Sequence, residues 1–212
     1  MNLLPIDTVI NKITMTSEAR IRGLHRALQE IHNNEIAGDI AECGVWRGGN
    51  IIIARTALDS VQDLRQYWAY DTFSGMTAPT AEDPPEAHAN WKFNPIINCL
   101  SPRREVENNF RQYQMLDDRI RIVQGPVEQT LLVDANLPDT IALLRLDTDW
   151  YSSTRCELEQ LYPRLVPGGI LIIDDYGFWS GCRRAVDEFF GTGFVQNNFE
   201  ILDDTGIMYK RP

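Results

Sequence analysis

Three aspartates follow two apolar segments in the second half of the sequence. Asp147 comes directly after the segment 140–146, and Asp174 and Asp175 come directly after the segment 169–173. If both segments are parallel strands joined by a helical crossover, their C-terminal ends lie at the same edge of a sheet, so the three carboxyl groups converge. Like charges in one cleft repel one another, and a divalent cation among them relieves that repulsion. The spacing therefore predicts a metal site.

The types of residue indicate which metal and which reaction. Carboxylate ligands without a neighbouring His or Cys favour Mg²⁺, Mn²⁺ or Ca²⁺ over zinc, and we expect Mg²⁺ or Mn²⁺. A cation beside a substrate hydroxyl stabilises the alkoxide, and a carboxylate is then needed to take the proton. Asp149 lies two residues after Asp147. We expect it to cap the next helix together with Ser152 and Ser153, rather than to bind the metal.

Two earlier segments have features of a nucleotide-binding sheet. The turn from Glu42 to Gly49 contains three glycines, which let a ligand approach the backbone, and a helix follows that directs its amides at an anionic group. The turn lacks the G-x-G-x-x-G pattern, and a tight structural turn also explains its glycines. Asp71 follows the strand predicted at 67–71, where an acidic side chain can accept both ribose hydroxyls. The alternative, a cap for the turn at 71–75, is less favoured by this position.

Strands and helices alternate along the chain. Five strands are predicted, and a pair of short segments flanking the turn at 203–206 predicts an antiparallel hairpin. The pattern is typical of a doubly wound, Rossmann-like α/β fold, mostly parallel with a C-terminal antiparallel hairpin, in one domain spanning 1–212. The predicted strands are 39–43, 67–71, 119–124, 140–146 and 169–173, and the hairpin segments are 194–202 and 207–210. The predicted helices are 17–34, 50–58, one that begins at 101, and 152–165. Pro163 should end the last of these helices early.

Two segments stand outside this alternation. Residues 1–37 form an N-terminal extension with an amphipathic helix, for which Ser17 is the expected N-cap. Residues 76–100 contain four prolines and no clear period, which favours a lid or binding insertion over a disordered surface loop. His88 in this segment has a possible part in proton transfer, but a solvated or aromatic-packed histidine is the favoured interpretation.

Composition excludes several classes of partner. A chain of 212 residues with a net charge of -10 lacks the positive surface that nucleic acid or anionic lipid requires. No apolar run is long enough for a membrane span, and the N-terminus lacks the pattern of a secretory signal, so we expect a cytoplasmic protein. The four cysteines form no C-x-x-C pair, and we interpret them as small core residues.

Four ordered motifs resemble one known family. The chain is similar to the macrocin O-methyltransferases, which methylate sugar hydroxyls of antibiotics and related natural products. The resemblance implies a class I methyltransferase that uses S-adenosylmethionine and Mg²⁺, acts on a small hydroxylated acceptor, most simply a glycoside, and forms homo-oligomers. The motifs are AECGVWRGG at 41–49, YDTFSGM at 70–76, LRLDTDWYSST at 144–154 and PGGILIIDDYG at 167–177.

The resemblance also implies roles for single residues. Asp147, Asp174 and Asp175 are the implied metal ligands, and Asp147 is also the implied general base and a neighbour of the cofactor. The methionine part of the cofactor is expected beside the first motif, its ribose on Asp71 and its adenine in the segment 124–128. The expected cofactor-binding residues are Glu42, Gly44, Val45, Trp46, Asp71, Ser74, Gly125, Glu128 and Asp147.

Two other functions stay open at this point. A metal-dependent catechol or phenol O-methyltransferase uses a similar carboxylate cluster with a flatter pocket. A protein that binds S-adenosylmethionine or a nucleotide without catalysis belongs to a different class. Carboxylates at all three predicted ligand positions argue against the second alternative, because binding alone does not require a metal cluster.

Overall fold

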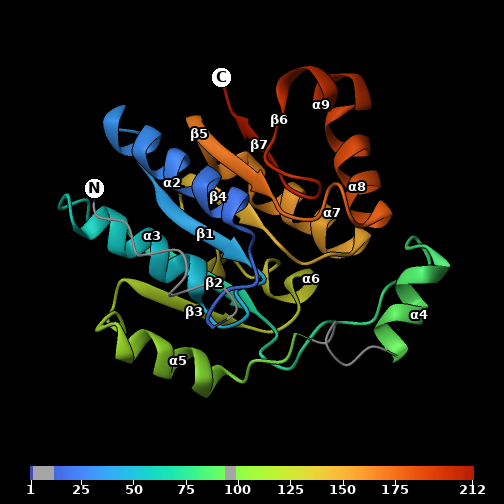
Figure 1. The fold of residues 1–212 in the computed structure, drawn as a ribbon, viewed down its shortest axis with the longest axis horizontal. Coiled ribbons are helices and arrows are strands. Elements are labelled where there is room, and N and C mark those ends of the chain that lie inside the picture. Colours follow the sequence, from blue (N-terminus) through green and yellow to red (C-terminus); the bar gives the residue numbers. More distant parts are fainter. Residues whose placement is uncertain (2–11, 94–98) are drawn as a thin grey trace.

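A single central sheet organises the computed structural model, which describes residues 1, 12–93 and 99–212 (Figure 1). Within these residues the sheet has seven strands in the order β3-β2-β1-β4-β5-β7-β6. Strands β1 to β5 are parallel, β7 runs antiparallel to β5, and β6 runs antiparallel to β7. The strands are β1 (Asp39–Cys43), β2 (Tyr67–Asp71), β3 (Ile120–Gln124), β4 (Ile141–Leu146), β5 (Leu165–Ile173), β6 (Glu200–Ile201) and β7 (Ile207–Lys210).

Helices cover both faces of this sheet (Figure 1). Alternate residues of the central strands face opposite sides, so that Ile170 and Ile172 of β5 join one core while Leu171 and Ile173 join the other. The first core lies under α2 (Glu18–Asn33), α3 (Gly49–Asp59) and α5 (Arg103–Gln112), and the second lies under α6 (Val127–Thr130), α7 (Tyr151–Gln160), α8 (Ser180–Phe190) and α9 (Thr192–Asn198). The predicted doubly wound α/β class is confirmed.

The four predicted helices agree with α2, α3, α5 and α7 to within a few residues once the expected early end of α7 is included, whereas α4 (Pro85–Phe93), α6, α8 and α9 were not predicted. Ser17 is the N-cap of α2, and its hydroxyl accepts a hydrogen bond from the Arg20 amide at 3.2 Å. Helix α7 ends at Gln160, ahead of Pro163, because proline cannot continue the hydrogen-bonded ladder. No helix among the described residues is long and apolar enough to cross a bilayer.

The C-terminal hairpin is shorter than predicted. Strands β6 and β7 pair across the expected turn, but the first half of the predicted segment 194–202 is helical, because α9 occupies Thr192–Asn198. The apolar side chains Phe194 and Phe199 suggested a strand. In the structure their rings pack with Phe190 and Tyr209 in one aromatic cluster, which a short helix satisfies as well as a strand does.

The insertion at 76–100 is more ordered than its irregular sequence suggested. Within its described part it contains helix α4 (Pro85–Phe93), which lies at the outer edge of the molecule (Figure 1). Pro95 and residues 2–11 of the predicted N-terminal extension lie outside the described residues. Asp83, just before α4, is buried, and its carboxylate accepts a hydrogen bond from the Tyr151 amide at 2.9 Å. The insertion is therefore fastened to the first turn of α7.

Chain order reverses between β1 and β4, the two strands at the centre of the sheet. Gly44 leaves β1 with a φ of +79°, and a Cβ at this position would lie 1.8 Å from the carbonyl oxygen of Asp147. Only glycine allows the two strand ends to approach this closely. Ligands of doubly wound proteins bind in the crevice at such a reversal.

Helix α2 is joined to the β6–β7 turn through Asp203. The Asp203 carboxylate accepts hydrogen bonds from the Ser17 hydroxyl at 2.5 Å and the Arg20 Nε at 3.0 Å, and from the amides of Thr205 and Gly206. Burial alone would raise the pKa of Asp203. These hydrogen bonds and the charge of Arg20 outweigh that effect and hold the pKa well below its usual range. The ionised form therefore stabilises the fold.

We expect Gly44→Ala to lower the free energy of unfolding by about 3 kcal/mol or more, because the new methyl group meets a backbone oxygen that cannot move aside. Chemical denaturation and the soluble yield measure this loss. Gly193→Ala is the matched control: it lies in α9 with no atom within 4 Å of the added Cβ, so we expect unchanged or slightly raised stability. Equal stabilities of the two variants would contradict the close approach.

We expect Asp203→Asn to lower the free energy of unfolding at pH 7 by about 1 kcal/mol. Since the pKa is depressed in the folded state, the stabilisation is present above the unfolded-state pKa of about 4 and is lost as the pH falls through the folded-state value. The stabilities of the two proteins should therefore begin to converge as the pH falls below about 4. The control Asp204→Asn changes the exposed neighbouring aspartate. A similar loss of stability in this control would contradict the role of Asp203 in joining α2 to the β6–β7 turn.

Candidate functional site

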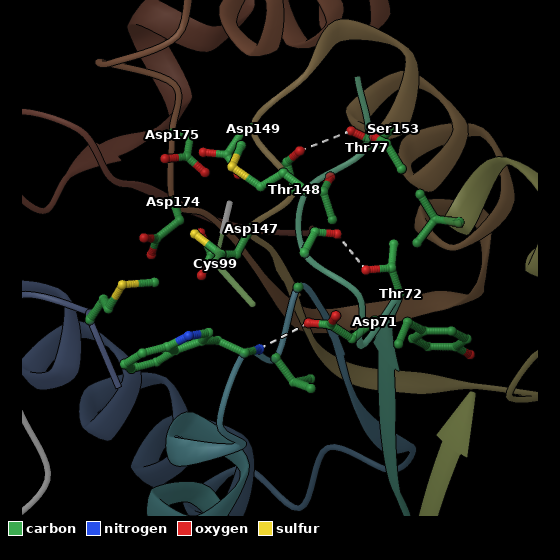
Figure 2. A pocket seen from close by; sticks show the side chains of 18 of the residues that line it. Asp71, Thr72, Thr77, Cys99, Asp147, Thr148, Asp149, Ser153, Asp174 and Asp175 are labelled. Carbon is green, nitrogen blue, oxygen red and sulfur yellow. Dashed lines mark hydrogen bonds between the residues drawn. The ribbon is translucent and has the colours of Figure 1, made fainter. Parts of the chain in front are cut away.

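A cavity of about 480 Å³ lies along the C-terminal edge of the parallel strands. Nine of the predicted site residues line it, from β1, β2, β3, β4 and β5 or the loops that follow them: Gly44, Val45, Trp46, Asp71, Gly125, Glu128, Asp147, Asp174 and Asp175. Glu42 and Ser74 do not. Figure 2 shows the carboxyl groups on one side of this cavity and Asp71 on another.

Asp147, Asp174 and Asp175 come together as the spacing predicted. Each offers one carboxylate oxygen, and the three oxygens lie within 4.8 Å of one another. Asp174 and Asp175 are buried, with exposed fractions of 3% and 9%, whereas the Asp147 side chain is 27% exposed. Burial raises the pKa of Asp174 to about 6, although the neighbouring Arg145 lowers it. Three oxygens at this separation form a set that a small divalent cation can bridge.

A buried arginine, Arg145, lies behind these carboxylates. Its Nη1 donates to Glu42 at 2.6 Å and Asp147 at 2.8 Å, and its Nη2 donates to Asp174 at 2.5 Å and to the Thr16 hydroxyl at 3.0 Å. The side chain is 3% exposed. The five-donor fork of a guanidinium can bind several carboxylates at once, which a lysine cannot do.

A second arginine reaches the same cluster from the N-terminal helix. Arg20 forms ion pairs with Asp174 and with Asp203 and lines the cavity. The expectation that only a cation relieves the repulsion among the aspartates was therefore incomplete, because two guanidinium groups contribute. Together the two arginines pair with Asp174, Asp203, Glu42 and Asp147, whereas Asp149 and Asp175 form no ion pair with either of them.

Asp149 does not cap helix α7, contrary to the expectation from sequence. Trp150 occupies the N-cap position without a side-chain bond, and Asp149 has a φ of +71° that turns its side chain toward the cavity, beside Asp175 (Figure 2). Its Oδ1 accepts a hydrogen bond from the Trp179 indole at 2.8 Å. The carboxylate of Asp83, rather than that of Asp149, accepts the hydrogen bond from the Tyr151 amide in the first turn of α7. Burial, followed by the charge of Asp147, raises the pKa of Asp149 to about 7.

Asp71 is the predicted turn cap and also lines the cavity. Oδ1 accepts from the Phe73 amide at 2.7 Å, which is the predicted turn cap, and Oδ2 accepts from the Trp46 amide at 2.9 Å. These bonds hold the carboxylate at the cavity wall, between the glycine turn and β3 (Figure 2). Each carboxylate oxygen has a second lone pair, so the side chain can still accept hydrogen bonds from a ligand.

The remaining predicted residues differ in their access to the cavity. Glu128 lines the cavity and accepts a hydrogen bond from the Ser152 hydroxyl at 2.9 Å. The backbone N–H of Gly125 donates a hydrogen bond to the carbonyl oxygen of Asp71 at 2.9 Å. Glu42 is buried behind the wall, bonded to Asn50 and Arg145, so its expected contact with a cofactor is replaced by a structural one. Ser74 is exposed outside the cavity.

His88 and the cysteines complete the comparison with the sequence. His88 is exposed, and its ring nitrogen bonds the Thr80 carbonyl oxygen within the insertion, away from the cavity. Cys43 and Cys182 are buried as expected, but Cys156 is only partly buried and Cys99 lines the cavity (Figure 2). The interpretation as core residues was therefore wrong for Cys99.

Sequence reasoning missed Arg145, Arg20 and the cavity-facing role of Asp149. A signal existed for Arg145, because it is the one charged residue in the run at 141–146, and all six residues of that strand are buried. A charge in a fully buried strand needs partners of opposite charge nearby. Arg20 gave no such signal, since it looks like one of several arginines on an amphipathic helix.

We expect Arg145→Met to lower the free energy of unfolding by about 3–5 kcal/mol, because it leaves several carboxylates in the interior without their partner. Chemical denaturation at neutral pH measures the effect. The control Arg22→Met removes an exposed arginine whose one ion pair among the described residues is with Glu18 on the same helix, and its effect should stay below about 0.5 kcal/mol. A similar small loss for both variants would show that Arg145 does not organise the cluster.

Known proteins resemble this chain over nearly its whole length. The family model described as macrocin O-methyltransferase matches residues 5–211. The chain is 33% identical over 209 residues to demethyldecarbamoylnovobiocin O-methyltransferase of Streptomyces niveus, covering 97% of this chain and 78% of that protein. It is 34% identical over 203 residues to mycinamicin III 3''-O-methyltransferase of Micromonospora griseorubida, covering 93% and 78%. The solved O-methyltransferase NovP has a TM-score of 0.83 at 33% identity, covering 95% of this chain and 83% of that one. This chain therefore belongs to the macrocin O-methyltransferase family and is an O-methyltransferase.

Proposed function

We propose that this protein transfers the methyl group of S-adenosylmethionine to a hydroxyl group on the sugar of a small natural product, with a divalent cation held by Asp147, Asp174 and Asp175. One observation carries the proposal: these three carboxylates meet at the wall of a cavity that continues to the glycine turn and to Asp71. Relatives that act on sugar-bearing natural products support the type of acceptor.

The residues fit the proposed methyl donor. A nucleoside needs a flat cleft and an acceptor for its ribose hydroxyls, and Asp71 lies beside the Gly125–Pro126–Val127–Glu128 segment at the end of β3. The methionine part carries both a carboxylate and an amino group. The start of α3, directly after the glycine turn, presents backbone amides that suit the carboxylate. S-adenosylmethionine supplies a methyl group on a cationic sulfur, which the acidic cavity wall favours electrostatically.

The residues also fit a divalent cation. Oxygen donors alone are the ligands that Mg²⁺ and Mn²⁺ prefer. Asp175 Oδ2 is buried and has no hydrogen-bond partner among the described residues, although a buried carboxylate oxygen normally has one. A bound cation supplies Lewis acidity that favours the alkoxide form of the acceptor. The resident arginines hold Asp147 and Asp174 in place beforehand, so the ligand set is preorganised.

The contacts support a division of roles between Asp147 and Asp149. The sequence pattern assigned both metal binding and proton transfer to Asp147. Its Oδ2 is engaged by Arg145, and a carboxylate shared between an arginine and a cation is a weak proton acceptor. Asp149 faces the same space, is paired with no arginine among the described residues, and is oriented through one oxygen only, by Trp179. In our proposal Asp147 holds the cation and Asp149 takes the proton from the acceptor hydroxyl.

The direct test is a transfer assay with labelled S-adenosylmethionine on a panel of glycosides and catechols. Methylated glycosides identified by mass spectrometry would support the proposal. Transfer to catechols alone would favour the metal-dependent phenol methyltransferase instead. Failure to bind S-adenosylmethionine in calorimetry would exclude both functions, because each depends on the same methyl donor.

We expect a chelator to abolish methyl transfer and added Mn²⁺ or Mg²⁺ to restore it.

Independently of activity, Asp175→Asn should weaken Mn²⁺ binding by more than about tenfold in electron paramagnetic resonance titrations, since it removes a charged ligand. Binding of S-adenosylhomocysteine should remain within about twofold, because Asp175 lies at the acceptor side. Asp134→Asn changes an exposed carboxylate far from the cluster and serves as control. Equal Mn²⁺ affinity in both variants would remove the metal site from the proposal.

The division of roles predicts different kinetic effects for two substitutions. Asp149→Asn should reduce kcat by about 100-fold or more, the usual contribution of a general base, while Mn²⁺ affinity stays near that of the wild type. Asp147→Asn should reduce Mn²⁺ affinity as well as turnover. If Asp149→Asn kept full turnover while Asp147→Asn lost it at saturating Mn²⁺, Asp147 would be the base, as the sequence pattern implied.

A further inference from the structure

The cavity has two chemically different ends. One end contains Asp71 and the segment after β3, which suit a nucleoside. The other end is marked by Asp174 and Asp175 and by two lining residues in contact with them, Arg20 and Phe178; Met15, Thr16 and Thr205 also line the cavity. Short contacts join this second end to the acidic cluster, because Arg20 pairs with Asp174 and the Phe178 amide donates to the Asp175 carbonyl at 3.1 Å. If the methyl donor takes the first end, as the proposed function requires, the acceptor takes the second.

Burial decreases outward along this second end. Asp174 and Asp175 are almost fully buried, whereas Met15 is 47% exposed and Phe178 is 64% exposed. If the hydroxyl of an acceptor reaches the buried carboxylates, the rest of the acceptor lies nearer the opening of the cavity, where Met15 and Phe178 are exposed. The polar groups that a sugar needs lie deeper, on Arg20, Thr16 and Thr205. Met15 and Phe178 offer only apolar surface.

Phe178 is supported in a fixed orientation. Its ring meets Trp179 edge to face, with centroids 4.8 Å apart and an interplanar angle of 86°. Trp179 is 6% exposed, packs against Trp150 with centroids 4.9 Å apart, and donates its indole N–H to Asp149. An aromatic ring that is largely exposed yet held on a buried support loses little conformational freedom when a ligand stacks on it.

We propose that Phe178, together with Met15, binds the aglycone of the acceptor by stacking on an apolar ring joined to the sugar. The inference rests on the proposed function and specifies its substrate: a glycoside of a flat or alicyclic aglycone, rather than a free sugar or a sugar carried only on a charged group. Stacking of aromatic rings contributes about 0.5–1.5 kcal/mol beyond the area that it buries, so the effect on binding is measurable.

The test compares two glycosides of whichever sugar the wild-type protein methylates, the 2-naphthyl and the methyl glycoside. We expect the wild type to have a lower KM for the naphthyl glycoside. Phe178→Ala should raise that KM by about tenfold, leave kcat nearly unchanged, and leave the KM for the methyl glycoside within about twofold. Phe178→Trp should restore the preference. The control Ile201→Ala truncates a side chain that is 76% exposed and outside the cavity.

Calorimetric binding of both glycosides in the presence of S-adenosylhomocysteine gives a readout without turnover. An unchanged naphthyl preference in Phe178→Ala, or no preference in the wild type, would overturn the proposal. A second copy of the chain is the competing occupant of this apolar surface. If Phe178→Ala changed the sedimentation coefficient and not the preference, Phe178 would be an interface residue and the proposal would fail. Absence of methyl transfer from the wild type to any glycoside would instead count against the proposed function.

Discussion

The acidic edge of the sheet depends on one buried guanidinium group, that of Arg145. It binds carboxylates from β1, from the end of β4 and from the end of β5, and so joins three adjacent strands at their C-terminal tips. Burying carboxylates without partners costs several kcal/mol each, so this convergence would not be stable without Arg145. Because the arginine holds Asp147 and Asp174 from behind, both carboxylates are positioned at the cavity wall before any ligand arrives, with Arg20 engaging the second oxygen of Asp174.

The order of strands then determines how the cavity is divided. The tips of β3, β2 and β1 carry the segment after Gln124, Asp71 and the glycine turn, while β4 and β5 carry the carboxylates. Gly44 permits the central strands to approach at the point where the chain order reverses. In the proposed function, a donor bound across β1 to β3 would face an acceptor held at β4 and β5. Alignment of the two reactants, which dominates catalysis of a single displacement, follows from the sheet itself.

The insertion between β2 and α5 is connected to the same site through aromatic side chains. Asp83 holds the first turn of α7, and the Thr77 carbonyl accepts from the Trp150 indole at 2.8 Å. Trp150 packs on Trp179, which orients Asp149. The described part of the insertion thus contributes to the position of a cavity carboxylate through Thr77 and Asp83.

The sequence by itself determined the fold class, the five parallel strands and the convergence of Asp147, Asp174 and Asp175. Hydrophobic periodicity and strand direction depend on local spacing, which one sequence contains. Only the tertiary structure decided the rest. Whether Asp149 caps a helix or faces the cavity depends on a positive φ and on Asp83, which lies 66 residues away in the sequence. Arg20 and Asp174 meet from opposite ends of the chain, and Glu42 lies behind the cavity wall because Arg145 pairs with it there. Such pairings are set by packing between distant segments, which residue spacing does not record.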